Sequence, residues 1–157
     1  MPCLCYYTSE MACPYFYPVE RDRRDIGMSS SLLPLGDAWV GLCRAAPGSA
    51  GPPDEALLHS LCHLGYARGR CDRFPPNDEG ADAVRFSIRG DDGVSLAVYY
   101  VLERDHHPFA HGPLEYSLPA GRFRQTPDRE TVSRQAEAYV QSYLRRKTEA
   151  ARHPSAS

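Results

Sequence analysis

The sequence has no long apolar segment and almost no lysine. None of its apolar runs approaches the roughly 18 residues that a membrane-spanning helix needs, so we expect no membrane partner. Lys147 is the only lysine, and the formal net charge of -2 gives no electrostatic reason to expect nucleic acid as a partner. The first residues lack both the basic region and the apolar region of a secretory signal. We therefore expect a cytoplasmic protein.

Motifs of the common enzyme classes are also absent. The sequence contains no Gly-x-Ser-x-Gly elbow, no phosphate-binding loop that ends in Lys-Ser or Lys-Thr, and no Gly-x-Gly-x-x-Gly fingerprint. Each of these motifs places a nucleophile or a phosphate at a defined turn, so its absence removes the usual sequence argument for that chemistry. The sequence therefore favours a protein that is not an enzyme.

The chain of 157 residues suits one domain of ordinary size. We expect a single domain over residues 1–150, with a cysteine-rich half at 1–80, a more regular half at 81–150 and a flexible tail at 151–157. Residues 1–31 show no periodic apolar pattern and are expected to be irregular.

The second half carries the clearest periodic patterns. Val84, Phe86 and Ile88 alternate with polar residues, and a Gly-Asp-Asp-Gly turn separates them from a second alternating run that ends at Leu102. A Thr-Pro pair at 126–127 predicts the start of a C-terminal amphipathic helix. These patterns predict a small α+β domain. Its β-hairpin-based antiparallel sheet packs against that helix, and its cysteine-rich N-terminal half is irregular.

Three further segments have weaker patterns. The segment 38–43 is predicted to be a short strand or a buried turn. A helix is predicted to begin at Asp54, a good N-cap, and to end at Gly65 or Gly69. Because residues 106–125 are rich in proline and glycine, we expect an irregular connection there.

Cysteine is unevenly distributed along the chain. All six cysteines lie in the first half, and the second half has none. In a reducing cytosol, clustered cysteines more often bind metal or react than form disulfides. The six are Cys3, Cys5, Cys13, Cys43, Cys62 and Cys71.

Four of these cysteines have surroundings that suit a metal cluster. An aromatic residue stands three positions after both Cys13 and Cys71, Cys43 ends an apolar run, and Cys62 lies on the predicted helix. Iron–sulfur clusters bind four thiolates and are tuned by apolar neighbours and backbone amides. Gaps of 29, 18 and 8 residues separate the four, without the paired Cys-x2-4-Cys knuckles of most zinc sites. We therefore predict that these four cysteines ligate one iron–sulfur cluster of the 4Fe–4S type, with a structural, electron-transfer or redox-sensing role and a redox or protein partner.

Two other interpretations need no cluster. The same thiols, with His59 or His63, could bind zinc and fix a protein-interaction module, because histidines four apart share a helix face. Cysteine is also among the residues most often buried, so core packing alone could explain Cys43 and Cys62. We interpret the neighbouring thiols of the segment 3–5 as exposed residues of a flexible tail.

A third interpretation is an enzyme with a cysteine nucleophile. Cys62 or Cys71 would attack the substrate, and His106 or His107 would act as the base. His111 belongs to the same histidine-rich segment. Because nothing in the sequence brings these groups together, a polar loop without catalytic function is the preferred interpretation of the histidines.

Overall fold

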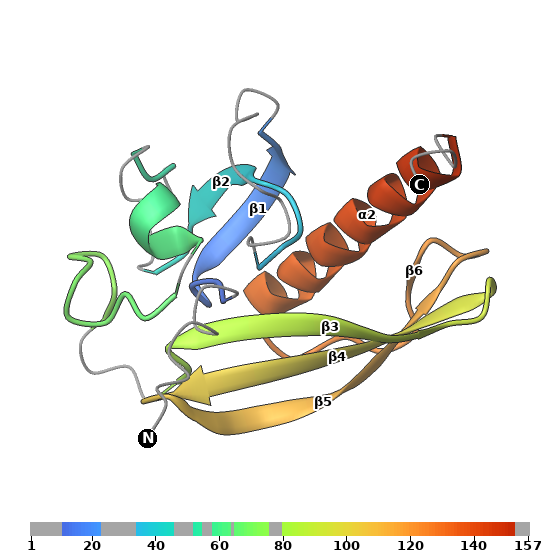
Figure 1. Ribbon diagram of the computed structural model, residues 1–157. Coiled ribbons are helices and arrows are strands. Elements are labelled where there is room, and N and C mark those ends of the chain that lie inside the picture. The colour runs from blue at the N-terminus through green and yellow to red at the C-terminus, as the bar shows by residue number, and fades with distance from the viewer. Residues whose placement is uncertain are drawn as a thin grey trace, which may run out of the picture.

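The computed structural model describes residues 11–22, 34–45, 52–54, 58–63, 65–75 and 80–152. These residues form two antiparallel sheets and a long C-terminal helix, which confirms the expected α+β class (Figure 1). Cys3 and Cys5 lie outside the described residues. Within the described part of the chain, no helix combines the length and the apolar character needed to cross a membrane.

The larger sheet contains the predicted hairpin. Its four strands run in the order β3 (Ala83–Asp91), β4 (Ser95–Arg104), β5 (His107–Ser117) and β6 (Arg122–Phe123). Phe86 pairs opposite Tyr100, so their side chains share one face of the sheet. Leu96, Val98 and Leu114 lie in the hydrophobic cluster against which these two rings pack. The alternation seen in the sequence therefore corresponds to one buried face.

The prediction of an irregular connection at 106–125 is wrong, because most of this segment forms β5 and β6. Tyr116 and Ser117 of β5 pair with β6, so residues 107–114 form the edge of the sheet among the described strands. Edge positions tolerate proline, which explains why a strand forms despite its two prolines. The turn from β4 to β5 consists of Asp105 and His106, both with positive φ (52° and 64°), as a tight two-residue hairpin requires.

The C-terminal helix α2 (Glu130–Arg152) lies between the two sheets (Figure 1). It begins at Glu130, four residues later than the Thr126 start predicted. Ala136 and Val140 pack into the hydrophobic cluster of the larger sheet. Ala138 belongs to a different cluster, which it shares with residues of the N-terminal half. The helix therefore buries two faces rather than one apolar stripe.

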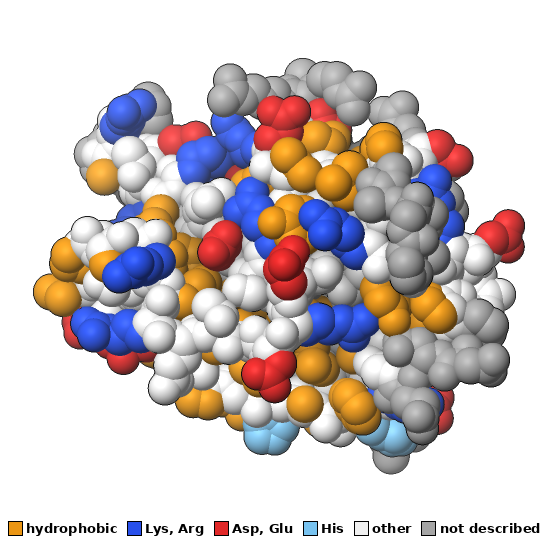
Figure 2. Space-filling view, turned by 180° about the vertical axis from the view of Figure 1, so that it is seen from behind, with side chains coloured by type: hydrophobic (Ala, Val, Ile, Leu, Met, Phe, Trp, Pro, Cys, Tyr) orange, Lys and Arg blue, Asp and Glu red, His pale blue; other side chains and the backbone are white. Residues whose placement is uncertain are grey.

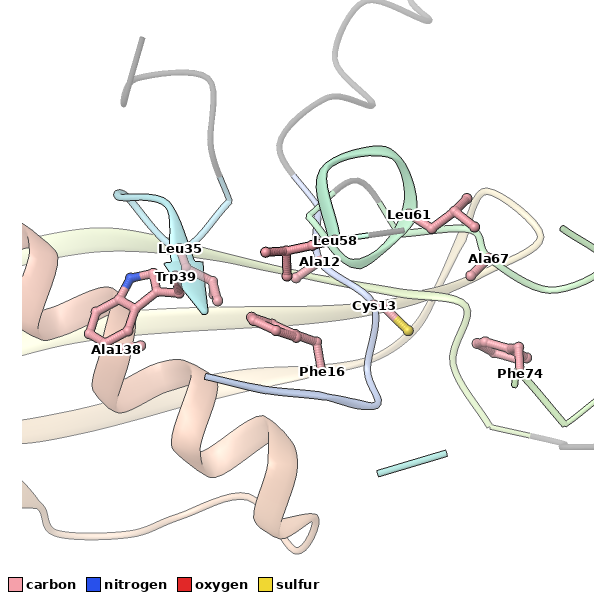
Figure 3. Packing of buried hydrophobic residues seen from close by; sticks show 10 residues of the cluster. All are labelled: Ala12, Cys13, Phe16, Leu35, Trp39, Leu58, Leu61, Ala67, Phe74 and Ala138. Atoms are coloured by element: carbon pink, nitrogen blue, oxygen red, sulfur yellow. The ribbon is translucent and has the colours of Figure 1, made fainter. Parts of the chain in front are cut away.

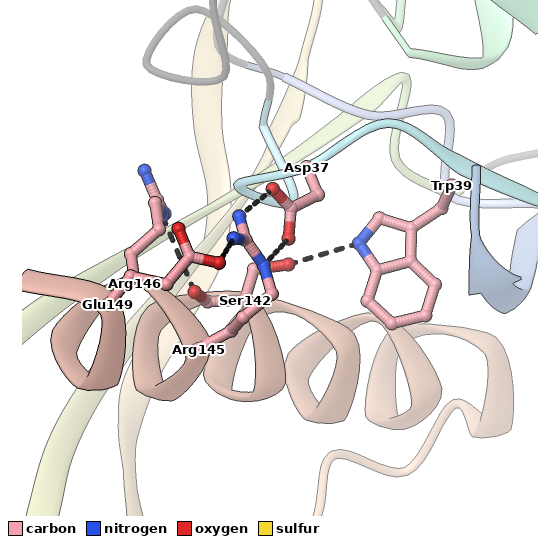
Figure 4. A network of polar contacts seen from close by, with 6 residues as sticks. All are labelled: Asp37, Trp39, Ser142, Arg145, Arg146 and Glu149. Carbon is pink, nitrogen blue, oxygen red and sulfur yellow. Dashed lines mark hydrogen bonds and ion pairs between the residues drawn. The ribbon is translucent and has the colours of Figure 1, made fainter. Parts of the chain in front are cut away.

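Polar contacts attach the second face of α2 to the N-terminal half (Figure 4). Trp39 donates from Nε1 to Ser142 Oγ at 3.2 Å, in a buried position. Arg145 donates from Nε to Asp37 Oδ2 at 3.0 Å and from Nη2 to Oδ1 at 2.5 Å. These bonds explain why a helix face that packs against protein carries serine and arginine.

The N-terminal half contains a second sheet of two strands, β1 (Phe16–Arg21) and β2 (Trp39–Cys43). The expectation that residues 1–31 are irregular is therefore wrong where β1 forms, and the segment 38–43 is a strand rather than a turn. Gly41 lies where the strands approach closely, because a Cβ added there would stand 2.0 Å from the Tyr17 carbonyl oxygen.

The predicted helix after Asp54 is represented by η3 (Leu58–Cys62), a five-residue π-helix. The N–H of Leu58 donates to the carbonyl of Asp54 at 2.9 Å. Gly65, with φ +74°, follows the helical turn, as expected for a residue that ends it. Short π-helical turns are rare and frequently lie at functional sites, so this one directs attention to Cys62.

Candidate metal centre

Four cysteines from four segments line one cavity. Cys13 precedes β1, Cys43 ends β2, Cys62 ends η3, and Cys71 lies in the loop that follows. The cavity has a volume of about 20 Å³. The rest of its wall is formed by Tyr15, Phe16, Ala45, Leu61, Ala67, Arg73 and Phe74. The structure thus brings together all four cysteines that the sequence singled out, in surroundings that are apolar except for one arginine.

Backbone hydrogen bonds hold the segments that carry the thiols. The N–H of Cys13 donates to the carbonyl of Cys62 at 3.0 Å, and the N–H of Arg44 donates to the carbonyl of Tyr15 at 2.9 Å. The N–H of Cys71 closes a turn onto a carbonyl four residues earlier at 2.8 Å. Figure 3 shows the Cys13 side chain within the hydrophobic cluster of this half. Contacts distant in sequence therefore fix the backbone beside Cys13, Cys43 and Cys62, whereas the bond at Cys71 is local.

Gln135 of α2 anchors the segment that begins at Cys13 through two hydrogen bonds. Its side chain is fully buried, and Nε2 donates to the carbonyls of Cys13 and Phe16, both at 2.7 Å. The sequence analysis did not identify this residue. A signal was present, because a glutamine stands next to Ala136 and three residues after Val132, within the apolar stripe.

The four thiols differ in depth and affect one another's ionisation. Cys13 and Cys43 are buried, whereas Cys62 and Cys71 are partly exposed. Burial raises the pKa of Cys13 to about 12, a hydrogen bond from the Tyr15 backbone opposes this, and the Cys43 and Cys71 thiols raise it further. Burial also raises the pKa of Cys62, as do the other three thiols. A bound cation would reverse this balance, because metal ligation favours thiolate.

These pKa directions bear on the interpretation of Cys62 as a nucleophile. Reactive cysteines have a lowered pKa, since the thiolate is the attacking species. Burial and neighbouring thiols instead raise the pKa of Cys62, so the protonated form dominates near neutral pH. This environment suits a ligand that loses its proton to a metal better than it suits a free nucleophile.

The described residues do not form a ready-made site for a single metal ion. Among the described residues, no three side chains of His, Cys, Asp or Glu are arranged to hold one metal ion. A tetrahedral zinc site with bonds of about 2.3 Å would bring its sulfurs within about 4 Å of each other. In a 4Fe–4S cluster each cysteine binds a different iron, so the sulfurs stand farther apart. The four-thiol donor set fits such a cluster in its chemistry.

His63, one of the two histidines considered as zinc ligands, is a core residue. It is buried, and Nε2 lies 3.0 Å from the Trp39 carbonyl oxygen. Its ring packs edge-on against Phe16 with centroids 5.4 Å apart. The side chain of His59 lies outside the described residues. His63 therefore supports the wall of the cavity from behind, and it is not among the residues that line it.

The later histidines lie on the larger sheet and do not line the cavity. His106 stacks on Tyr66 with ring centroids 4.1 Å apart, and the backbone N–H of His106 donates to the Tyr66 hydroxyl at 2.9 Å. His111 Nδ1 lies 2.5 Å from the Tyr99 hydroxyl, and His107 is the first residue of β5. The structure does not place these histidines with the thiols as the enzyme interpretation requires.

A second, larger hollow of about 590 Å³ lies beside the turn between β5 and β6. Most of its described lining residues are exposed, and none of them is a cysteine or histidine. They are Ser117, Ala120, Arg122, Phe123, Arg124 and Thr126. Its volume alone would make this hollow the better candidate for a binding site, but the four cysteines line the smaller cavity.

The evidence for a site in this protein comes from its own residues. Four thiols and an apolar wall converge at one cavity of the N-terminal half, and a buried glutamine of α2 holds the backbone of Cys13. Comparison with known proteins provides no independent guide: no family model, no curated protein and no solved structure matches this chain.

Proposed function

We propose that this protein holds one iron–sulfur cluster through Cys13, Cys43, Cys62 and Cys71. The observation that carries the proposal is that these four thiols, from four separate segments, line the same apolar cavity. Four thiolates are a complete ligand set for a 4Fe–4S cluster. The described cysteines form no disulfide, which agrees with a reducing compartment such as the cytoplasm.

One hydrogen bond at the thiols suits the proposed centre. The backbone N–H of Tyr15 donates to the Cys13 sulfur, and hydrogen bonds to cluster sulfurs are one of the ways proteins tune such centres.

A cluster needs more room than a cavity of about 20 Å³. We expect the Cys71 loop to move outward, because Gly69, Arg70 and Asp72 on it are exposed. Gly69 also has no atom within 4 Å of an added Cβ, so the loop has open space around it. The movement would widen the cavity without disturbing the β1–β2 pair or α2.

The proposed role is first structural. Metal bonds to all four segments would fasten β1, β2, η3 and the Cys71 loop to one another, and metal binding adds directly to folding free energy. Electron exchange is a second capability of the same centre. Because Cys62 and Cys71 are partly exposed, a redox partner would exchange electrons from their side of the cavity.

Anaerobic purification followed by iron and sulfide analysis tests the proposal. We expect a brown protein with about four irons and four sulfides per chain. Changing Cys13, Cys43, Cys62 or Cys71 to serine should abolish the colour, because each removes a ligand. Cys3→Ser and Cys5→Ser are the matched controls and should keep it. A colourless wild type without metal would show that the cysteines only pack the core.

Zinc is the alternative occupant, and the small volume of the cavity favours it. The same thiols would then fix the fold of an interaction module, with no redox chemistry. A colourless protein with one zinc per chain, whose cobalt-substituted form shows thiolate-to-cobalt absorption, would support zinc and exclude the cluster.

A further inference from the structure

An aromatic pair covered by arginine side chains forms part of the wall of the thiol cavity. Tyr15 and Phe74 both line the cavity and contact each other edge to face, with ring centroids 5.3 Å apart. The Arg129 guanidinium lies 4.4 Å from the Tyr15 ring centroid, and that of Arg68 lies 4.8 Å from the Phe74 ring centroid. Arg73 lines the cavity itself. Positive charge is therefore held close to the four thiols.

The three arginines do not contribute equally. Arg68 Nε lies 2.7 Å from the Asp82 carboxylate, which is almost fully buried, so that carboxylate offsets its charge. Arg73 lines the cavity together with the four thiols, and Arg129 lies over the Tyr15 ring, which lines the cavity as well. Arg73 and Arg129 therefore hold positive charge at the cavity from two different segments of the chain.

The charge of the proposed centre determines what these two cations would do. A 4Fe–4S cluster with four thiolates is a net anion, and one-electron reduction adds one more negative charge. In an apolar cavity a nearby cation stabilises the reduced state more than the oxidised state, because the reduced state carries more charge. Stacking on Tyr15 holds the Arg129 guanidinium beside the ring and limits its freedom to turn toward solvent.

We propose that Arg73 and Arg129 are positioning residues that hold positive charge at the cavity and thereby raise the midpoint potential of the cluster. The inference rests on the proposed cluster and deepens it, since it assigns the control of its redox state. The electron comes from an external one-electron donor, and no bond to a ligand forms or breaks. The guanidinium groups would form no bond to the cluster in this role and would act through their electric field at the cavity.

Redox titration of the holoprotein, followed by electron paramagnetic resonance, tests the inference. Arg129→Gln and Arg73→Gln should each lower the midpoint potential. We expect an approximately tenfold smaller ratio of reduced to oxidised cluster at fixed potential, which is about 59 mV for one electron. Arg129→Lys and Arg73→Lys should recover most of the shift, because they restore the charge. Arg122→Gln, an exposed arginine on β6, is the control and should leave the potential unchanged.

The outcomes separate this inference from the proposed function. A wild type without iron and sulfide overturns both, before any arginine is changed. A wild type with a cluster, whose potential stays the same in both glutamine variants, overturns the inference alone. If the glutamine variants lose the cluster, the lysine variants decide: a retained cluster at the wild-type potential supports a charge effect. Loss of the cluster in the lysine variants as well would show that the shape of the arginine side chain matters rather than its charge, and would overturn the inference.

Discussion

The two halves of the molecule are ordered by different means. The larger sheet and α2 form a core of Leu96, Val98, Leu114 and Val140, with continuous strand pairing from β3 to β5. In the N-terminal half, the strands have six and five residues and the only described helix, η3, has five. Its hydrophobic cluster combines Cys13 and three alanines with six large side chains, which are Phe16, Leu35, Trp39, Leu58, Leu61 and Phe74. Because these side chains come from short segments, we expect this half to depend more than the other on links between its segments.

The helix α2 belongs to both halves, and the contacts on its two faces differ in kind. Toward the larger sheet it presents Ala136 and Val140, and toward the N-terminal half it presents the polar groups of Gln135, Ser142 and Arg145. Hydrogen bonds need defined geometry, whereas apolar packing is less directional. The N-terminal half is therefore oriented on α2 by specific bonds, which suits a site that depends on the placement of four thiols.

The largest expected effect comes from removing the proposed metal. Cys62→Ser or Cys71→Ser should lower the local opening free energy of residues 11–75 by about 3 kcal/mol or more, because metal bonds formed only in the native state add directly to stability. Residues 83–152 should keep their protection. Hydrogen exchange read segment by segment, alongside metal content, measures both halves at once. Cys3→Ser should change neither quantity.

The result that would break the comparison is equally specific. If both cysteine variants kept native protection throughout and the wild type carried no metal, the N-terminal half would be held by burial, as the other half is. The four cysteines would then be core residues that happen to share a cavity.

The second effect concerns the core of the larger sheet. Leu96→Ala should cost about 2–5 kcal/mol of global stability, because it removes a fully buried side chain and leaves a cavity. The loss should be the same with and without metal, since Leu96 is in the cluster on the other face of α2. Denaturant unfolding of the holoprotein and of the metal-free protein measures it. A loss that depends on metal would show that the two halves are not ordered independently.

The third effect tests the link through α2. Gln135→Leu should cost about 1–3 kcal/mol, because the carbonyls of Cys13 and Phe16 each lose the hydrogen bond that the buried amide donates. Gln135→Glu is the matched variant, and as a carboxylate it has no hydrogen to donate to those carbonyls. It should destabilise the protein at pH 7 and recover part of the loss at acid pH, where the protonated carboxyl can donate once. Equal stability of both variants at every pH would show that side-chain volume, not hydrogen bonding, matters there.

The sequence predicts the sheet and helix better than the rest of the fold, for a physical reason. The hairpin of β3 and β4 is local, and its alternating residues report directly which face is buried. The pairing of β1 with β2 joins segments separated by residues 22–38, and no periodic pattern of apolar residues in the sequence predicts which segments pair. β5 was not predicted, because its two prolines are typical of a loop, although an edge strand can accommodate them.

The candidate site shows the same division. The clustering of cysteines along the chain identified the four residues that line the cavity. A cysteine can be recognised as a possible metal ligand from the sequence even where the local structure cannot be predicted. That they bind a cluster stays a prediction. Gln135 and Arg129 were not identified, since each reaches the site through the fold. Arg73 was not identified either, although it lies two residues after Cys71, because arginine is frequent in this chain and nothing local marks this one.

The smallest effect lies at the far end of the sheet–helix half, where Asp91 accepts hydrogen bonds at the hairpin turn. Asp91 Oδ2 lies 2.6 Å from Lys147 Nζ and 2.7 Å from the Tyr143 hydroxyl, and Oδ1 accepts from the Gly93 N–H at 3.0 Å. These bonds, that of Lys147 first, lower the pKa of Asp91 to about 2. A lowered pKa means that the contribution of Asp91 to stability is complete above about pH 4, the usual pKa of this carboxyl, and is lost as the pH falls toward 2.

Lys147→Gln should raise the pKa of Asp91 toward its usual value and weaken this acid dependence, whereas Tyr143→Phe should raise the pKa less. Carboxyl carbon chemical shifts measured through an acid titration report the pKa directly. Because the pair is exposed, added salt should reduce the difference between wild type and Lys147→Gln. A pKa that Lys147→Gln leaves near 2 would mean that the backbone of the turn, rather than its bond to α2, holds the carboxylate.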